Sequence, residues 1–313
     1  MTPLVSVVIC THNRADLLPM ALRSLVEQQM PKEQFEVILV DNRSTDDTRA
    51  VAEHYAHALN LRYVYEAQLG LSYARNTGWR NARALAIAYL DDDAAACPGW
   101  LNTIVGVFEC GDPQVGCVGG KVEPLWETVR PAWLSDNLAV MLSAIDWSET
   151  PHALVDLKQE WLVGANFAFR AEVLQAIGGF VDGLDRVGTQ LLSGGDVYIQ
   201  RQIMQAGYTC YYEPAMQVRH FTPRSRLTQP WFLKRCYWQG ISDIAMQMVE
   251  SAPSRQERYR LISGKLRWIL RSPQALSHLL LPQQQPQPFL EKCWAVVALG
   301  QIVGLLRLKP RRA

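Results

Sequence analysis

Three consecutive aspartates, Asp91, Asp92 and Asp93, follow an apolar run at residues 84–90. Burying carboxylates is costly unless positive charge meets them, and this run contains no lysine or arginine. In an extended strand, Asp91 and Asp93 would share one face and Asp92 would lie on the other. Two carboxylates on one face suit Mg²⁺ or Mn²⁺, with substrate phosphates completing the coordination of the metal. The positive partner that the carboxylates lack is expected to arrive with the substrate. A solvated acidic turn, with Asp93 capping a following helix, is the ordinary alternative.

The elements that must position these aspartates alternate along the first third of the chain. Continuous apolar, β-branched runs predict strands, and repeats at helical spacing predict helices between them. Such alternation is typical of βαβ units with a parallel sheet, in which ligands bind beyond the carboxyl ends of the strands. Polar clusters follow three of the predicted strands, at residues 11–14, 41–42 and 91–93.

The later sequence predicts a second half of the same domain and then a change of character. Short strand-like and helical segments continue to about residue 222, and arginine- and glutamine-rich helices follow. We therefore divide the chain into a domain at 1–222 and a basic helical extension at 223–313. Within the domain, residues 1–110 form a first half and residues 111–222 a second.

The charge of the 313-residue chain is unevenly distributed. The formal net charge is +1, but residues 1–218 carry −11 and residues 219–313 carry +12. In the extension, residues 255–281 interleave arginines with leucine, isoleucine and tryptophan, a pattern typical of helices at anionic membrane surfaces. A helical cap on the domain or a dimer contact is the alternative. Nucleic acid is not expected, because no recognition motif accompanies the charge.

Localisation is predicted from what the sequence lacks. The seven cysteines show no zinc spacing, which favours a reducing compartment. The first residues lack the charged start of a signal peptide, and the apolar stretch at 293–306 is shorter than the roughly 20 residues that a membrane span needs. We expect a cytoplasmic protein, either free or peripheral on the cytoplasmic face of a membrane. Neither phosphate-cradling glycine motif, GxxxxGK[ST] or GxGxxG, is present, so a nucleotide would be held by side chains and the metal.

A series of motifs resembles the family 2 glycosyltransferases. In order along residues 4–221, they read VSVVICTHNR, FEVILVDNRSTDDT, GLSYARNTG, LDDD, LVGANFAFRAEVLQAIGGF and SGGDVYIQRQIMQAGYTCYYEPAMQVRH. The resemblance implies an inverting enzyme that uses a nucleoside-diphosphate sugar as donor, with residues 1–110 binding this donor and residues 111–222 binding the acceptor. It also implies the α/β GT-A fold, a Rossmann-like, mostly parallel central sheet flanked by helices. The QxxRW motif of processive synthases is missing, so we expect a single addition.

The resemblance assigns roles to particular residues. Asp93 is implied to bind a divalent cation, Mn²⁺ or Mg²⁺, at the donor diphosphate, with His220 as a possible second ligand. A satisfied core or surface histidine is the alternative for His220. The residues implied to bind the nucleotide sugar are Thr11, Asn13, Arg14, Asp41, Arg75, Asp91, Asp93 and Asn166.

Asp196 matches the catalytic base of the family. It would take the proton of an acceptor hydroxyl on a glycan or a lipid-linked acceptor while that oxygen attacks the anomeric carbon. Gly195 precedes it where a glutamate is common, and capping of the following helix is the alternative function of Asp196. Two other functions stay open: a catalytically silent subunit that binds sugar nucleotides or acts as a scaffold, and a nucleotidyltransferase that releases pyrophosphate.

Overall fold

The computed structural model describes residues 2–271 and 283–309, and within them the chain forms two compact units. The first unit comprises Met1–Leu125, Ser143–Asp182 and Asp196–Phe221. The second comprises Trp126–Leu142, Gly183–Gly195 and Thr222–Ala313. Two segments from within residues 1–222 therefore belong to the second unit, so the compact units do not follow the linear division at residue 222. That division stays a prediction.

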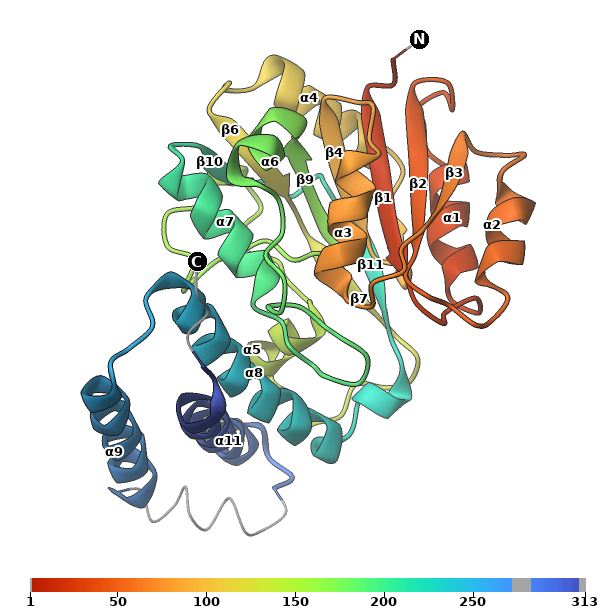
Figure 1. Cartoon of the computed structure of the whole chain (residues 1–313). Coiled ribbons are helices and arrows are strands. Elements are labelled where there is room, and N and C mark those ends of the chain that lie inside the picture. Colours follow the sequence, from red (N-terminus) through yellow and green to blue (C-terminus); the bar gives the residue numbers. More distant parts are fainter. Residues whose placement is uncertain (1, 272–282, 310–313) are drawn as a thin grey trace. The chain divides into compact units, whose positions relative to one another are not determined.

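An eight-stranded sheet forms the centre of the first unit, in the order β3-β2-β1-β4-β9-β6-β10-β8 (Figure 1). β1 is parallel to β2 and β4, β2 to β3, and β10 to β6. β9 is antiparallel to both β4 and β6, and β8 is antiparallel to β10. The strands are β1 (Val5–Thr11), β2 (Phe35–Asp41), β3 (Leu61–Tyr65), β4 (Ala86–Leu90), β6 (Val115–Gly119), β8 (His152–Ala153), β9 (Asn166–Arg170) and β10 (Thr209–Tyr212).

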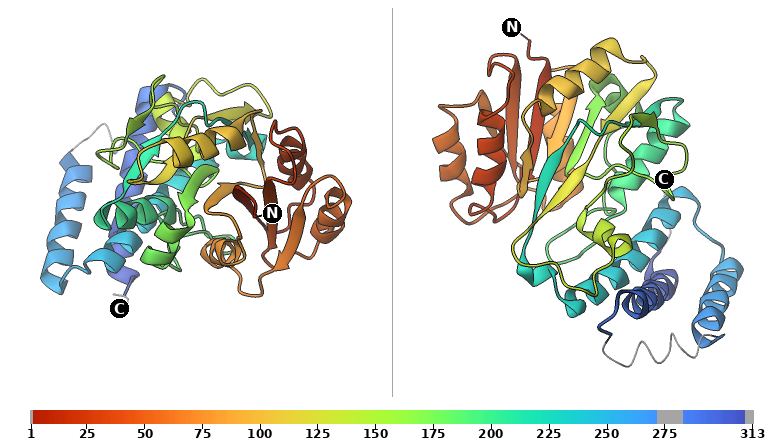
Figure 2. Two further views of the ribbon diagram at one scale, coloured as in Figure 1. Left: turned by 90° about the horizontal axis from the view of Figure 1, so that it is seen from above. Right: turned by 180° about the vertical axis from the view of Figure 1, so that it is seen from behind.

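Helices cover both faces of this sheet, which confirms the predicted α/β architecture (Figure 2). One hydrophobic cluster joins one face to α1 (Leu18–Val26), α2 (Thr48–Tyr55) and α4 (Trp100–Cys110). A second cluster joins the other face to α3 (Leu71–Arg80), α6 (Ala171–Ile177) and α7 (Gly195–Gln205). Because side chains alternate along a strand, β1 sends Val7 to the first cluster and Val8 to the second, which explains why its sequence is apolar apart from Ser6 and Thr11.

A small second sheet, in the order β5-β11-β7, brings distant parts of the chain to the aspartates. Its strands are β5 (Ala94–Ala96), β7 (Val122–Trp126) and β11 (Val218–Thr222). β11 pairs antiparallel with β5 so that His220 lies opposite Ala94. The amide of Phe221 also donates to the carbonyl of Asp93 at 2.8 Å. This register places the predicted histidine ligand beside the aspartates.

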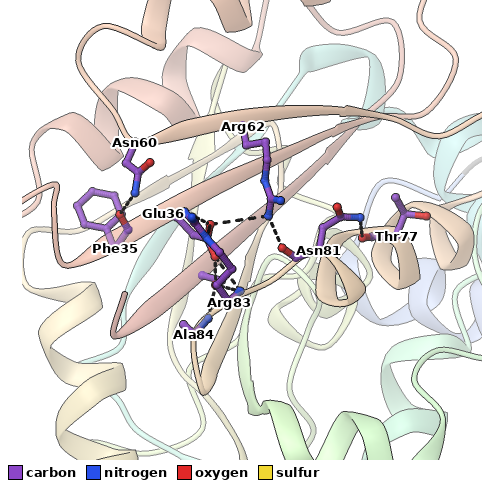
Figure 3. A network of polar contacts seen from close by, with 9 residues as sticks. Phe35, Glu36, Asn60, Arg62, Thr77, Asn81, Arg83 and Ala84 are labelled. Atoms are coloured by element: carbon purple, nitrogen blue, oxygen red, sulfur yellow. Dashed lines mark hydrogen bonds and ion pairs between the residues drawn. The ribbon is translucent and has the colours of Figure 1, made fainter. Parts of the chain in front are cut away.

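A buried carboxylate lies near the amino ends of β1 and β2 (Figure 3). Glu36 is 1% exposed and accepts hydrogen bonds from Ser6 Oγ at 2.7 Å and from the amide and Nε of Arg83, both at 2.8 Å. Arg62 approaches the same carboxylate at 3.8 Å. Burial alone would raise the pKa of Glu36, but the hydrogen bonds from Ser6 and Arg83 outweigh it and lower that pKa.

The second unit is helical. Its helices are α5 (Asp136–Ala139), α8 (Gln229–Glu250), α9 (Arg255–Arg271) and α11 (Pro286–Arg307), with short 3₁₀ turns at Val140–Leu142 and Arg224–Arg226. α8 and α11 pack closely against each other at Gly240. A Cβ at this position would lie only 2.0 Å from the carbonyl oxygen of Val297 on α11, so a larger residue would not fit. Among the described residues, α11 is long and apolar enough to span a membrane, but 56% of its apolar window is buried inside the protein. The remainder of the predicted amphipathic stretch, residues 272–281, lies outside the described residues.

Candidate active site

The three aspartates lie in a turn after the buried strand, not within it. β4 ends at Leu90, the amide of Ala94 donates to the carbonyl of Asp91 at 3.0 Å, and β5 begins at Ala94. The prediction that strand alternation sets the directions of the three side chains is therefore wrong, although Asp91 and Asp93 are still the two aspartates that share one site, together with His220. The helix-cap alternative for Asp93 is also wrong, because a strand follows Asp93 and the next helix begins at Trp100.

Arg14, from the loop between β1 and α1, supplies positive charge to this turn. Its Nη1 forms an ion pair with Asp93 and lies 3.3 Å from Oδ1 of Asp92. Burial alone would lower the pKa of Arg14, but the carboxylates of Asp92 and Asp93 outweigh it and raise that pKa. Burial raises the pKa of Asp92 to about 7 against the attraction of Arg14. The expectation that a positive partner would come only with the substrate is therefore corrected.

His220 completes a group of three potential metal ligands. Its Nε2 lies 3.0 Å from Oδ1 of Asp93 and 4.0 Å from Oδ2 of Asp91, and one ligand atom from each residue fits within 4.8 Å. His220 is 4% exposed, so it is a buried histidine whose ring faces two carboxylates. Burial and the charge of Asp93 raise the pKa of Asp91. Two carboxylates and one imidazole are a donor set that Mn²⁺ accepts, so these residues fit the predicted divalent cation.

Asp196 is held in place from two directions. Its Oδ1 accepts a hydrogen bond from Nη1 of Arg75 at 2.7 Å, and its Oδ2 accepts one from the amide of Gly164 at 2.8 Å. Arg75 is 4% exposed at its side chain and lies over the rings of Phe167 and Phe180 at 5.3 and 5.1 Å. The Asp196 side chain keeps 27% of its surface exposed. The aromatic rings and the ion pair therefore fix the carboxylate while part of it remains accessible.

The metal-ligand group and Asp196 lie close enough to interact electrostatically. Asp196 contributes to raising the pKa of Asp91, and Arg75 acts in the opposite direction on the same carboxyl group. Residues from the turn after β4, from β11, from α3 and from the start of α7 thus form one charged site. Gly164 was not among the predicted site residues. Its only sequence signal is a glycine just before a strand, and a Cβ there would lie 1.9 Å from Nη2 of Arg75.

The structure brings Thr11 and Asp41 to the same edge of the sheet, where they are paired in register at the ends of β1 and β2. Both are buried. Oδ1 of Asp41 accepts from the amide of Ser44 at 2.7 Å, and Oδ2 accepts from the hydroxyl of Tyr63 at 2.5 Å. Burial and Asp41 raise the pKa of Tyr63 to about 12. The roles of Thr11 and Asp41 toward a nucleotide stay predictions.

Asn13 joins two of the loops at this edge. It has a left-handed backbone with φ 53°, and its Oδ1 accepts from the amide of Thr45 at 2.7 Å. The loop after β1 is thereby tied to the loop after β2. This contact orders the segment that also carries Arg14, but binding of the nucleotide sugar by Asn13 stays a prediction.

Asn166 is placed differently from the other predicted donor-binding residues. It is fully buried, and its Oδ1 accepts from the indole Nε1 of Trp100 at 2.8 Å. Its Nδ2 donates to the carbonyl oxygens of Lys121 and Met216 at 3.0 and 2.6 Å. These bonds tie together segments that are far apart in sequence and give Asn166 a structural function. Its predicted contact with the donor stays a prediction.

Comparison with known proteins identifies the family. The model of the family "Glycosyl transferase family 2" matches residues 6–178, more than half of the chain. The chain belongs to glycosyl transferase family 2. It is 24% identical over 307 residues to the glucosyl-dolichyl phosphate glucuronosyltransferase of Haloferax volcanii, covering 96% of each chain. It is also 31% identical over 212 residues to glycosyltransferase AglE of the same organism, covering 66% of this chain and 63% of AglE.

Solved structures of glycosyltransferases share the fold. The mannosyltransferase PcManGT from Pyrobaculum calidifontis, in complex with GDP-Man and Mn²⁺, superimposes with a TM-score of 0.58 at 22% identity, covering 98% of this chain and 74% of PcManGT. Residues 1–349 of S. aureus TarS, in complex with UDP, give a TM-score of 0.55 at 16% identity, covering 97% and 91%. The predicted GT-A fold is confirmed, and this family 2 member is a glycosyltransferase.

Proposed function

We propose that this glycosyltransferase moves a single sugar from a nucleoside-diphosphate sugar to a hydroxyl of a glycan or lipid-linked acceptor, with inversion at the anomeric carbon. The observation that carries the proposal is the fixed but accessible carboxylate of Asp196, in electrostatic contact with the ligand group of Asp91, Asp93 and His220. The residues proposed as the base and as the diphosphate site belong to the same unit of the protein.

Asp196 would act as the base. A carboxylate offers about four lone-pair positions, and the bonds from Arg75 and Gly164 use one on each oxygen. The remaining positions can accept the hydrogen of an acceptor hydroxyl, which makes that oxygen a better nucleophile as it attacks. The proton moves to Asp196, and the bond between the anomeric carbon and the diphosphate oxygen breaks. A single displacement of this kind inverts the centre.

Asp91, Asp93 and His220 would hold the divalent cation. When bound there, Mn²⁺ or Mg²⁺ would neutralise negative charge on the departing nucleoside diphosphate. Arg14 already lies on the other oxygen of Asp93, so it would orient that carboxylate and add positive charge on the same side. The Mn²⁺ bound with GDP-Man in PcManGT supports this assignment.

The donor would lie beyond the carboxyl ends of β1, β2 and β4. The solved relatives hold GDP-Man, UDP or UDP-GlcNAc, which supports a nucleoside-diphosphate donor for this chain. We assign donor contacts to the loop residues at that edge, with Arg75 acting through Asp196. The residues assigned to the donor are Thr11, Asn13, Arg14, Asp41, Asp91 and Asp93.

A lipid-linked acceptor is supported by a relative and by α9. The name of the Haloferax volcanii glucuronosyltransferase, which aligns with nearly the whole chain, includes glucosyl-dolichyl phosphate, a lipid-linked sugar. On α9, Tyr259, Leu266, Trp268 and Leu270 are 43 to 64% exposed. Exposed arginines lie among them at positions 260, 267 and 271. Exposed apolar side chains with arginines are typical of a helix that lies on an anionic membrane surface, and we place the protein there, on the cytoplasmic face.

The proposal is tested by donor binding and turnover. The full chain is screened by thermal unfolding with Mn²⁺ and UDP-glucose, UDP-GlcNAc, UDP-glucuronate or GDP-mannose, because a true donor stabilises the fold by mass action. Release of nucleoside diphosphate is then measured with glucosyl prenyl phosphate as acceptor. Asp196→Asn should keep donor binding and lose turnover, whereas the exposed control Asp47→Asn should keep both.

Three results would contradict the proposal. Equal turnover by the wild type and Asp196→Asn would show that Asp196 is not the base. Donor binding without turnover on any glycan or lipid-linked acceptor would favour the silent sugar-nucleotide-binding subunit, and release of pyrophosphate would favour a nucleotidyltransferase.

A further inference from the structure

A glutamine on α7 is completely buried one turn after the proposed base. Gln200 follows Asp196 by four residues and has no exposed surface. Glutamine is usually found at the surface of proteins, because its side-chain amide can both donate and accept hydrogen bonds and water meets this need there. A fully buried glutamine therefore requires polar partners inside the protein, and these partners show what it holds in place.

The side chain of Gln200 pairs with both backbone groups of Leu162. Its Oε1 accepts from the amide of Leu162 at 2.8 Å, and its Nε2 donates to the carbonyl of the same residue at 2.9 Å. Nε2 also donates to the carbonyl of Asp196 at 2.6 Å. The opposite orientation of the side-chain amide would set its NH₂ group against an N–H and its oxygen against two carbonyls. Gln200 thus joins Leu162 to the backbone of the proposed base.

Leu162 begins a short segment that also holds the carboxylate of Asp196. Two residues further on, the amide of Gly164 donates to Oδ2 of Asp196 at 2.8 Å. The segment is closed by the amide of Asn166, which donates to the carbonyl of Val163 at 2.9 Å. The side chain of Asn166 is in turn bonded to Trp100 and to two backbone carbonyls. Gly164 therefore lies between two anchored residues, all of them in the first unit.

We propose that Gln200 is a positioning residue for the base, acting through residues 162–164. The first two turns of α7 bind this segment twice, through the side chains of Asp196 and Gln200. If the segment moved, the carboxylate would lose its bond on Oδ2 and could rotate about the bond that Arg75 still holds on Oδ1. A shift of about 1 Å in a catalytic group can cost about a hundredfold in rate. The inference rests on the proposed function of Asp196 as base.

Two substitutions at Gln200 test the proposal by kinetics. Gln200→Met keeps the length of the side chain without its hydrogen bonds, and Gln200→Glu keeps an acceptor for Leu162 but loses at least one donated bond. With Mn²⁺, glucosyl prenyl phosphate and each of UDP-glucose, UDP-GlcNAc, UDP-glucuronate and GDP-mannose, Gln200→Met should lower kcat by about tenfold or more while donor KM changes by less than about twofold. Gln200→Glu should retain more of the kcat. Gln205→Met, at an exposed glutamine of the same helix, should match the wild type.

Amide hydrogen exchange of the free protein tests the same link without a substrate. In Gln200→Met, the Gly164 amide should exchange at least about tenfold faster than in the wild type, whereas the amide of Val8, buried in β1, reports any change in global unfolding. Gln200→Glu should give a smaller effect and is the variant to use if Gln200→Met does not fold. Exchange that rises at Leu162 while Gly164 stays protected would show that Gln200 serves local packing alone, and the proposal would fall. Unchanged kcat, or a change in donor KM alone, would also overturn it.

Failure of the proposed base gives a different pattern. If Asp196→Asn kept wild-type turnover, the assignment of Asp196 as base would fall, and exchange at Gly164 would still decide whether Gln200 holds the segment. If Asp196→Asn lost turnover while Gln200→Met kept it, only the inference about Gln200 would fall.

Discussion

Nη1 of Arg75 lies 2.7 Å from Oδ1 of Asp196, and the two residues are 121 positions apart in the sequence. Arg75 is buried between two aromatic rings, and its own backbone carbonyl accepts from the hydroxyl of Tyr89 at 3.1 Å. The arginine is therefore fixed on α3 before any substrate binds. It orients the proposed base more directly than it could contact a nucleotide.

Arg75→Lys should lower turnover strongly while leaving donor binding nearly unchanged. A lysine lacks the planar fork of the guanidinium and cannot reproduce its hydrogen-bond geometry over the rings of Phe167 and Phe180. We expect a loss of about a hundredfold in kcat, the size associated with a misplaced catalytic group. Arg80→Lys on the exposed side of the same helix is the control. Steady-state release of nucleoside diphosphate gives kcat and the donor KM for each variant. A raised donor KM with unchanged kcat would instead show that Arg75 contacts the donor.

Removal of one metal ligand should weaken the response to Mn²⁺. His220→Ala leaves Asp91 and Asp93 without their imidazole partner, and we expect Mn²⁺ affinity to fall by at least about tenfold. Mutation of a residue that only hydrogen-bonds to a metal ligand already lowers metal affinity by about that factor. The rise in unfolding temperature on titration with Mn²⁺ and UDP measures the affinity. His152→Ala, at a histidine paired with Glu160 outside this group, should respond like the wild type. The same Mn²⁺ dependence in both variants would exclude His220 as a ligand. In a separate measurement, removal of the metal with EDTA should abolish turnover of the wild type.

The buried carboxylate of Glu36 should make stability depend on acid pH. Glu36→Gln should destabilise the fold by about 1–3 kcal/mol at neutral pH, because donors from Ser6 and Arg83 lose a charged acceptor. The folded-state pKa of Glu36 lies below its ordinary value of 4.5, so its contribution is fully present above that value and declines as the pH falls through it. Urea unfolding at several pH values should show the gap between wild type and variant narrowing in acid. Glu53→Gln, at an exposed pair with Arg49, should change stability by no more than about 0.5 kcal/mol at any pH.

Two helical glycines should respond in opposite directions to alanine. A Cβ at Gly78 on α3 would lie 2.3 Å from Cγ1 of Val8 on β1, so Gly78→Ala should cost about 1–3 kcal/mol by overpacking. Gly106 on α4 has no atom within 4 Å of the same position, so Gly106→Ala should stabilise by up to about 1 kcal/mol through helix propensity. Thermal unfolding of the two variants tests the close packing of α3 on the sheet. Equal shifts would contradict it.

The exposed arginines of α9 should control binding to anionic vesicles. Changing Arg260, Arg267 and Arg271 together to glutamine should weaken binding by about a hundredfold, at about 1 kcal/mol per charge near the surface. Co-sedimentation with vesicles of phosphatidylcholine and phosphatidylserine gives the affinity, and pure phosphatidylcholine should bind poorly. Arg49→Gln on α2 is an exposed control. Binding that is insensitive to all three arginines, or equal on both kinds of vesicle, would leave α9 as a helical cap.

Local sequence determined the strands, the family and the position of the aspartate turn. The largely apolar sequence of β1 predicts a strand buried on both faces, and the structure confirms this because helices cover both faces of the sheet. Whether a segment forms a strand or a helix is indicated by the spacing of its apolar residues, so this much can be predicted from the sequence alone. The same is true of the order of motifs that identified glycosyl transferase family 2.

Only the tertiary structure decided which charges meet. Arg14 reaches Asp93 across 79 positions and His220 reaches it across 127. These pairings depend on sheet order, strand register and close packing, which bring distant residues together independently of any local pattern. The sequence therefore named most of the charged groups of the site, whereas folding determined their partners.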